Sequence, residues 1–142
     1  MKKALSFVAA LLISTSAFSA INATVYKDPY CGCCEAYIAY LQQHGFTVTA
    51  VNRNDMAQLK NQLGVKTNEA SCHTMKIGNY IVEGHVPVKA IQKMLKDKPS
   101  ITGITVPGMP ANSPGMGVEK PGTLAVFEIN AKSVMPKLYG KY

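Results

Sequence analysis

Short apolar strands alternate with amphipathic helices in the first half of the chain. The residues Thr-Val-Tyr at 24–26 predict a strand. Apolar residues then recur at helical spacing from residue 34, and His44 and Gly45 end this helix. Residues 46–51 alternate and are rich in β-branched side chains, which predicts a second strand. A second helix is predicted over residues 55–63, with a glycine directly after it.

The second half of the chain begins with a predicted hairpin over residues 71–82, whose tip is the Gly78-Asn79 turn. An apolar stripe with lysines on the opposite side then predicts a third helix that begins at residue 88 and ends before Pro99. Periodicity is lost over residues 100–122, which are rich in proline and glycine and contain two methionines. Residues 124–129 are predicted to form the last strand.

The order strand, helix, strand, helix, hairpin, helix predicts an α/β fold of the thioredoxin-like type, with a long Pro/Gly/Met loop before the last strand. The chain has 142 residues, of which 47% are hydrophobic and 16% are charged, so it can bury a substantial core. We therefore expect a single domain over residues 20–142.

Residues 1–19 have the pattern of a secretory signal peptide. Two lysines precede a short apolar run, and small residues surround a cleavage site near Ser19. The run is too short to span a bilayer, although an uncleaved anchor is the alternative. We expect export to the periplasm and no membrane contact after cleavage. Removing Lys2 and Lys3 from the 15 basic residues, against eight acidic ones, leaves a net charge of +5. These charges are scattered, so we expect no nucleic-acid partner.

Three of the four cysteines lie within four residues, in the sequence CGCC at residues 31–34. Cys31 and Cys34 form a C-x-x-C pair, which is a redox motif, while Cys33 makes a C-x-C pair with Cys31 and a vicinal pair with Cys34. The amino-terminal end of the following helix favours thiolates, which are both nucleophiles and ligands of soft metals. In a thioredoxin-like fold, the segment that contains Cys72 passes directly over the C-x-x-C pair.

Four interpretations of these cysteines can be compared. Dense thiols with nearby methionines suit Cu(I), which prefers thiolate and thioether ligands and accepts bridging sulfurs. Zinc is the competing metal, but the vicinal Cys33 and Cys34 do not easily bind one tetrahedral ion. A metal-free thiol–disulfide oxidoreductase would use Cys31 as the attacking thiol and Cys34 as the resolving thiol. A purely structural disulfide role is the weakest interpretation, because a C-x-x-C bridge closes a very small loop.

Four further residues are candidate members of the site. His73 is a metal ligand, a base beside Cys72, or a strand histidine bonded to a carbonyl group. His85 lies in a glycine-bounded turn, where a supporting hydrogen bond fits as well as metal ligation. Met109 and Met116 lie in the long loop without a periodic core around them, so both thioether ligation and loop packing remain open.

Four sequence blocks together resemble the signature of the CopG-like family of small exported bacterial proteins, associated with copper resistance and formerly a domain of unknown function. The blocks are KDPYCGCC at residues 27–34, SCHT at 71–74, EGHVP at 83–87, and VPGMP through SPGM at 106–116. They occur in the family's order and cover almost the whole chain after the signal peptide. Two departures, Tyr37 for tryptophan and Asn112 for glycine, involve no ligand position.

The resemblance implies a thioredoxin-like fold whose cysteines bind Cu(I), with room for several ions bridged by thiolates, and a role in copper redox handling. Carried over residue by residue, it implies Cys31, Cys33, Cys34 and Cys72 as the ligands. Copper ions are then the expected partner, and other exported copper-handling proteins are further candidate partners.

Overall fold

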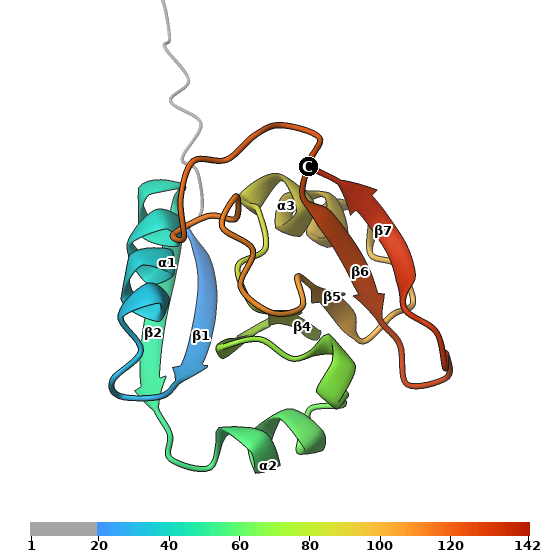
Figure 1. The fold of residues 1–142 in the computed structure, drawn as a ribbon, viewed down its shortest axis with the longest axis horizontal. Coiled ribbons are helices and arrows are strands. Elements are labelled where there is room, and N and C mark those ends of the chain that lie inside the picture. Colours follow the sequence, from blue (N-terminus) through green and yellow to red (C-terminus); the bar gives the residue numbers. More distant parts are fainter. Residues whose placement is uncertain (1–19) are drawn as a thin grey trace, which may run out of the picture.

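The computed structural model describes residues 20–142, so the predicted signal peptide lies outside the described residues. A seven-stranded mixed sheet forms the centre of the molecule, in the strand order β2-β1-β3-β4-β5-β6-β7 (Figure 1). The elements are β1 (Ile21–Lys27), α1 (Gly32–Gln43), β2 (Phe46–Asn52), α2 (Met56–Gln62), the short 3-10 helix η1 (Thr67–Glu69), β3 (His73–Ile77), β4 (Tyr80–Glu83), α3 (Val88–Asp97), β5 (Gly103–Thr105), β6 (Ala125–Ile129) and β7 (Lys137–Lys141).

Strand β1 lies between β2, which runs parallel to it, and β3, which runs antiparallel. Helix α1 connects the parallel strands β1 and β2, as such a pair requires a crossover. Strands β3 and β4 form the predicted hairpin, with Ile77 paired to Tyr80 across the tip. Strand β5 is parallel to β4, and β6 and β7 complete the sheet in antiparallel order.

Helices cover the sheet on both faces, with α1 and α3 on one side and α2, through Lys60, on the other. Successive residues of each strand point to opposite faces. Val82 of β4 belongs to the large core, in which α1 and α3 pack on one face of the sheet. Its neighbour Ile81 belongs to a small second cluster on the other face, together with Val65 and Ile129. The fully buried side chains of the large core include Val25, Tyr37, Leu41, Met75, Val82, Ile91, Met94, Ile104 and Val126.

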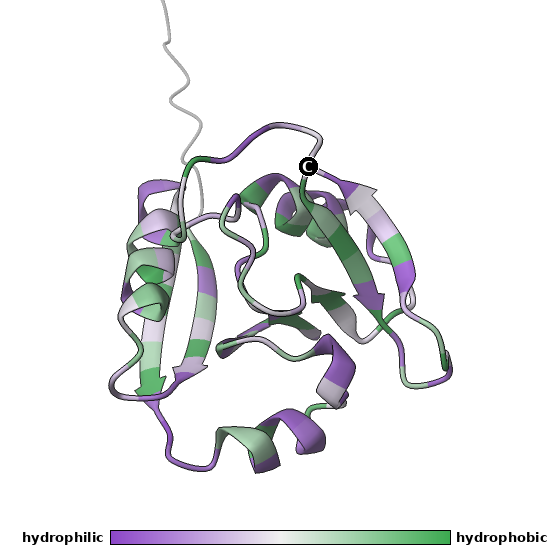
Figure 2. Ribbon diagram, in the orientation of Figure 1, coloured by the Kyte–Doolittle hydropathy of each residue, from purple (hydrophilic) through white to green (hydrophobic). Residues whose placement is uncertain are grey.

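Most of the buried apolar residues lie in these two clusters. Figure 2 shows apolar colour over most of β6, whereas α2 carries both apolar and hydrophilic colour. Within residues 20–142, no helix combines the length and the hydrophobicity that a bilayer crossing requires.

The three predicted helices and the hairpin are confirmed, but the prediction for the carboxy-terminal part is wrong in two places. Strand β5 lies inside the predicted loop, and β7 follows the strand that was expected to be the last. Strand β5 has only three residues, and a Cβ atom at Gly103 would lie 1.7 Å from the backbone oxygen of Ile81. A glycine is required there because the two backbones approach so closely. The loop between β5 and β6 covers residues 106–124.

Candidate metal centre

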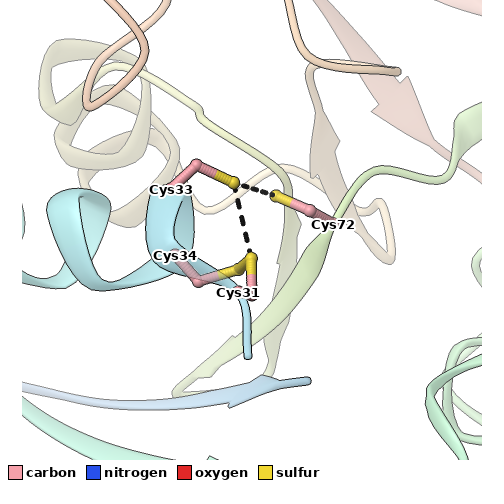
Figure 3. Close-up of side chains that lie close together, drawn as sticks. All are labelled: Cys31, Cys33, Cys34 and Cys72. Carbon is pink, nitrogen blue, oxygen red and sulfur yellow. Dashed lines mark hydrogen bonds between the residues drawn. A yellow bond between two sulfur atoms is a disulfide. The ribbon is translucent and has the colours of Figure 1, made fainter. Parts of the chain in front are cut away.

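The four cysteine sulfurs lie together at the amino-terminal end of α1 (Figure 3). Cys33 Sγ lies 3.4 Å from Cys31 Sγ and 3.7 Å from Cys72 Sγ. All four Sγ atoms lie within 4.8 Å of one another, although Cys72 follows Cys33 by 39 positions in the sequence. The expected convergence of the fourth cysteine on the CGCC segment is therefore present in the structure.

A tight turn between β1 and α1 presents the CGCC segment. The Asp28 carboxylate accepts a hydrogen bond of 2.8 Å from the Tyr30 N–H group, and the Asp28 carbonyl accepts one of 3.2 Å from the Cys31 N–H group. Aspartate and proline at the start of such a turn favour this geometry. Cys31 is the extended residue before the helix, so α1 begins at Gly32 and not at Cys34 as predicted.

Cys31 and Cys34 form a disulfide bond, whereas Cys33 and Cys72 are free thiols. The Cys34 side chain is fully buried, and that of Cys31 is partly exposed. The structure therefore represents an oxidised state of the C-x-x-C pair. Two electrons must enter this disulfide before all four sulfurs can act as thiolates.

Cys72 reaches the other sulfurs because the segment before β3 is fixed at several points. The Ser71 N–H group donates a hydrogen bond of 2.7 Å to the Glu83 carboxylate, and the Gly108 N–H group donates one of 3.0 Å to the Ala70 carbonyl. A Cβ atom at Gly84 would lie 2.6 Å from the Ser71 side chain, so only glycine permits this approach. The Ser71 hydroxyl also donates to the Gly108 carbonyl.

The Glu83 carboxylate is fully buried and has three hydrogen-bond donors. Besides the Ser71 N–H group, it accepts from the Lys60 ammonium group of α2 and from the Thr74 hydroxyl, the latter at 2.6 Å. Burial raises the pKa of Glu83, and the Lys60 charge opposes that shift. The sequence patterns did not predict this role. The available signal was a single acidic residue at the end of the otherwise apolar strand 80–83, because buried carboxylates need partners.

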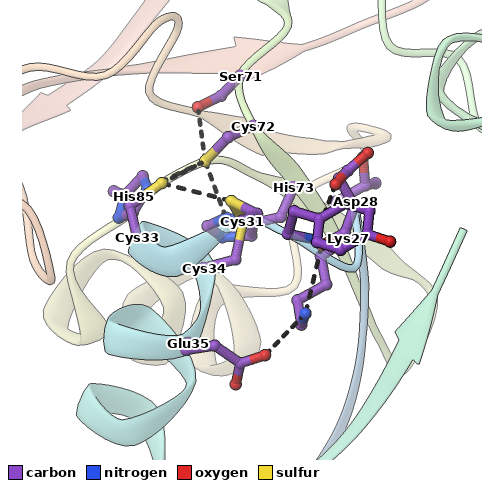
Figure 4. Close-up of a disulfide and its surroundings, with 12 residues drawn as sticks. Lys27, Asp28, Cys31, Cys33, Cys34, Glu35, Ser71, Cys72, His73 and His85 are labelled. Carbon is purple, nitrogen blue, oxygen red and sulfur yellow. Dashed lines mark hydrogen bonds and ion pairs between the residues drawn. A yellow bond between two sulfur atoms is a disulfide. The ribbon is translucent and has the colours of Figure 1, made fainter. Parts of the chain in front are cut away.

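His85 is held in one orientation beside Cys72 (Figure 4). Its Nδ1 atom lies 2.7 Å from the Pro114 carbonyl oxygen, and its Nε2 atom lies 3.1 Å from Cys72 Sγ. A carbonyl oxygen can only accept a hydrogen bond, so Nδ1 carries the proton. The Nε2 lone pair is then free to accept the Cys72 thiol proton or to bind a metal.

His73 lies on β3 and is buried against Tyr37, with the ring centres 4.6 Å apart. Its Nδ1 atom lies 3.3 Å from Cys72 Sγ, while its buried Nε2 atom has no hydrogen-bond partner. Burial, followed by the neighbouring His85 and Lys60, lowers the pKa of His73 to about 3, and burial also lowers the pKa of His85. Both imidazoles are therefore neutral at neutral pH, which is the form that binds metals. With Cys72 they form a second group of close metal-ligating atoms.

Burial raises the pKa of the Cys72 thiol to about 12, with a further contribution from its contact with Cys33. In the metal-free state this sulfur therefore carries its proton. A bound soft cation reverses this preference, because a coordinating thiol is deprotonated by the charge of the metal.

The backbone of the long loop lies against the site. Pro114 accepts the His85 hydrogen bond, and a Cβ atom at Gly115 would lie 2.9 Å from the Tyr37 backbone nitrogen. The side chains of Met109 and Met116 are 54% and 36% exposed. The loop is thus placed beside the cysteines, whereas ligation by either thioether remains a prediction.

A second buried charge near the site was also missed by the sequence patterns. Lys27, at the end of β1, is only 2% exposed, and its ammonium group lies 2.7 Å from the Glu35 carboxylate in the first turn of α1 (Figure 4). The pair joins the strand to the helix that carries the C-x-x-C disulfide. A lysine in the turn sequence before the cysteines is expected to be exposed, because lysines are rarely buried.

Comparison with solved structures finds two that are similar over most of the chain, "Copper resistance protein copG- Form 2" and "Copper resistance protein copG- Form 1". They are 36% and 35% identical to this chain, cover 87% of it in both cases, and are themselves covered to 99% and 98%, with a TM-score of 0.77 for each. The chain therefore belongs to the CopG-like family. The resemblance seen in the sequence blocks is confirmed.

A family model described as "Protein of unknown function, DUF411" matches residues 69–116. This range contains Cys72, both candidate histidines and both loop methionines, but not the CGCC segment. No curated protein matches the chain.

Proposed function

We propose that this protein is a copper resistance protein that binds copper as Cu(I) on Cys31, Cys33, Cys34 and Cys72. In the reduced state these thiolates would hold several ions as a bridged cluster, in the service of copper resistance or copper redox handling. The observation that carries the proposal is the convergence of four sulfurs within 4.8 Å, three from the start of α1 and one from the segment before β3.

The donor set supports a soft metal. Four sulfurs form one group of close donor atoms, and Cys72 with two neutral imidazoles forms a second group, while no carboxylate belongs to either group found within residues 20–142. Thiolate and imidazole donors favour copper and zinc over magnesium or calcium. Zinc fits less well, because the vicinal Cys33 and Cys34 do not easily bind one tetrahedral ion. The two similar structures, both of a copper resistance protein, favour copper further.

His73, His85, Met109 and Met116 complete the proposed site in different ways. His85 Nε2 and His73 Nδ1 contact Cys72 Sγ and would bind copper directly or orient this thiolate. The two methionines lie on the loop that contacts His85, and we propose that their thioethers exchange Cu(I) with other exported copper-handling proteins.

We further propose that the fold is thioredoxin-like and that the protein works in the periplasm after removal of residues 1–19. The position of the C-x-x-C pair at the start of α1, with the Cys72 segment beside it, supports the first statement. The second rests on the sequence pattern alone. Mass measurement of protein recovered from the periplasm should give a chain that begins at Ala20, and a full-length membrane-bound chain would contradict the export proposal.

Anaerobic titration of the reduced protein with Cu(I) tests the copper proposal. We expect more than one Cu(I) per chain for the wild type and loss of this uptake when Cys31, Cys33 and Cys34 are all changed to serine. Met56→Leu, on α2, is a control that removes one thioether outside the proposed site and should leave uptake unchanged. One tightly held zinc ion that Cu(I) does not displace would overturn the cluster.

A thiol–disulfide oxidoreductase is the second candidate function. One observation favours it: the Cys31–Cys34 disulfide lies at a helix amino terminus, with Cys31 partly exposed and Cys34 buried. An attacking thiol must be accessible, whereas a resolving thiol can be buried.

The double variant Cys33→Ser with Cys72→Ser separates the two candidates. It keeps the Cys31–Cys34 pair, so an oxidoreductase would retain most of its exchange activity with a model disulfide substrate. Under the copper proposal the same variant loses copper binding and copper tolerance. Full exchange activity with unchanged copper tolerance would reverse our ranking of the two functions.

A further inference from the structure

Cys33 lies between the disulfide and the second free thiol. Its sulfur is 3.4 Å from Cys31 Sγ, a member of the disulfide, and 3.7 Å from Cys72 Sγ. Sulfur atoms at such distances are close enough to react once one of them is a thiolate, because exchange proceeds by attack of a thiolate on a disulfide sulfur. Within the compact group of four sulfurs, Cys33 Sγ thus contacts both a sulfur of the disulfide and the other free thiol.

We infer that Cys33 transfers the oxidised state from the Cys31–Cys34 disulfide to a Cys33–Cys72 disulfide by two intramolecular exchange steps. This activity needs no copper and goes beyond the proposed copper binding. It also gives the free thiols Cys33 and Cys72 a defined role in the oxidised protein.

In the first step the Cys33 thiolate attacks Cys31 Sγ. A Cys33–Cys31 bond forms, the Cys31–Cys34 bond breaks, and Cys34 leaves as a thiolate that takes up the proton lost by Cys33. The helix amino terminus stabilises the leaving thiolate, since Cys34 lies in the first turn of α1. Gly32 has open space around it, with no atom within 4 Å of a Cβ placed there, so this segment has room to adjust.

In the second step Cys72 attacks Cys33 Sγ. The Cys33–Cys72 bond forms while the Cys72 proton moves towards His85 Nε2, 3.1 Å away, so no free Cys72 thiolate is needed, and the leaving Cys31 sulfur finally takes up this proton. The Pro114 carbonyl, 2.7 Å from His85 Nδ1, keeps Nε2 directed at the sulfur. A nucleophile, a base and a group that orients the base are the three parts of an activated thiol. No external oxidant or reductant is required, because one disulfide and two thiols are present before and after.

The experiment starts from metal-free protein with the single Cys31–Cys34 disulfide, held anaerobically with a chelator and no redox reagent. After incubation the sample is quenched with acid, alkylated and digested with trypsin. Cys72 lies in peptide 67–76 and the other three cysteines lie in peptide 28–53, so a disulfide between these two peptides reports the transfer. We expect this linked pair in the wild type and a loss of about tenfold or more in Cys33→Ser.

Two further variants locate each step. Cys72→Ser should stop after the first step, which leaves Cys34 open to alkylation and no linked peptides. His85→Gln should slow formation of the linked pair by about tenfold or more, whereas His44→Gln, at the far end of α1, should not change the rate. If Cys33→Ser does not retain its disulfide and its melting temperature, Cys33→Ala replaces it.

Absence of linked peptides in the wild type would overturn the inference. A linked pair that forms equally fast in the Cys33 variant would mean that Cys72 attacks the disulfide directly, and this result would also overturn the role of Cys33. Because no copper is present, neither result bears on the copper proposal, and the Cu(I) titration fails or succeeds separately.

Discussion

Two polar clusters lie on opposite faces of the β3–β4 hairpin, and they differ in chemistry. On the face covered by α1, the Cys72 thiol and the two imidazoles beside it are neutral, and the buried Nε2 atom of His73 has no partner. On the face covered by α2, the fully buried Glu83 carboxylate is bonded to Lys60, Thr74 and Ser71. The first cluster leaves donor atoms available for a ligand, while the second has its donors and acceptors satisfied within the protein.

The Glu83 cluster holds the chain segment that carries Cys72. The Glu83 carboxylate binds the Ser71 N–H group directly before Cys72, and the pairing of β3 with β1 begins only at His73. Lys60 holds the carboxylate in place from α2. The position of the fourth sulfur therefore depends on an ion pair on the other side of the sheet.

The largest expected effect follows from breaking this ion pair. Glu83→Gln leaves the Lys60 ammonium group buried without its counter-charge, and loss of one member of a buried pair costs about 3 kcal/mol or more in the free energy of unfolding. Glu128→Gln is the matched control. It breaks the Glu128–Lys137 pair, whose lysine side chain is 70% exposed, so we expect a loss below about 1 kcal/mol. Denaturant unfolding at pH 7 measures both values, and equal losses would contradict the supporting role of Glu83.

A smaller effect concerns the pH dependence of the metal-free protein. The pKa of His73 falls from 6.5 in the unfolded chain to about 3 in the folded protein, mainly through burial. Below pH 6.5 the unfolded chain binds a proton that folded His73 does not bind, so stability is present above this pH and is lost as the pH falls towards 3. Between pH 6 and pH 4 this single group should lower the free energy of unfolding by roughly 2 to 3 kcal/mol.

His73→Leu tests this assignment, because leucine fits a buried strand position and does not titrate. The difference in unfolding free energy between pH 6 and pH 4 should shrink by about the stated amount in the variant. Other groups titrate in the same interval, so only the difference between the two proteins is interpreted. An equal pH dependence would mean that His73 is already protonated or solvated in the folded state.

The smallest effect on stability is expected for the loop methionines. Met109→Leu combined with Met116→Leu conserves volume, so the free energy of unfolding should change by less than about 1.5 kcal/mol. If the thioethers pass Cu(I) to other proteins, copper capacity is kept and the rate of copper exchange with a chelator falls. An unchanged exchange rate would leave both residues as packing groups of the loop.

Local patterns in the sequence predicted the helices and the β3–β4 hairpin. They also predicted that the four cysteine sulfurs lie close together. The residues that place these cysteines were not predictable in this way. Glu83 and Lys60 are 23 positions apart, and only the folded sheet brings them together. The same holds for His85 and Pro114, whose contact depends on the path of the loop.

Short elements were missed for a related reason. Strand β5 has three residues and begins with Gly103, which disfavours strands in isolation but is needed against Ile81. Strand β7 contains Gly140 and two lysines and lies at the edge of the sheet, where the alternation of apolar and polar residues is weak. Long-range pairing, and not local propensity, defines both strands.

The central claim is that the converging sulfurs hold several copper ions together. X-ray absorption spectroscopy of the reduced, Cu(I)-loaded protein tests it most directly, because it reports both the atoms bound to copper and any neighbouring copper. We predict that sulfur dominates the atoms bound to copper and that a second copper ion contributes to the scattering. A single copper ion with nitrogen or oxygen ligands and no copper neighbour would contradict the claim.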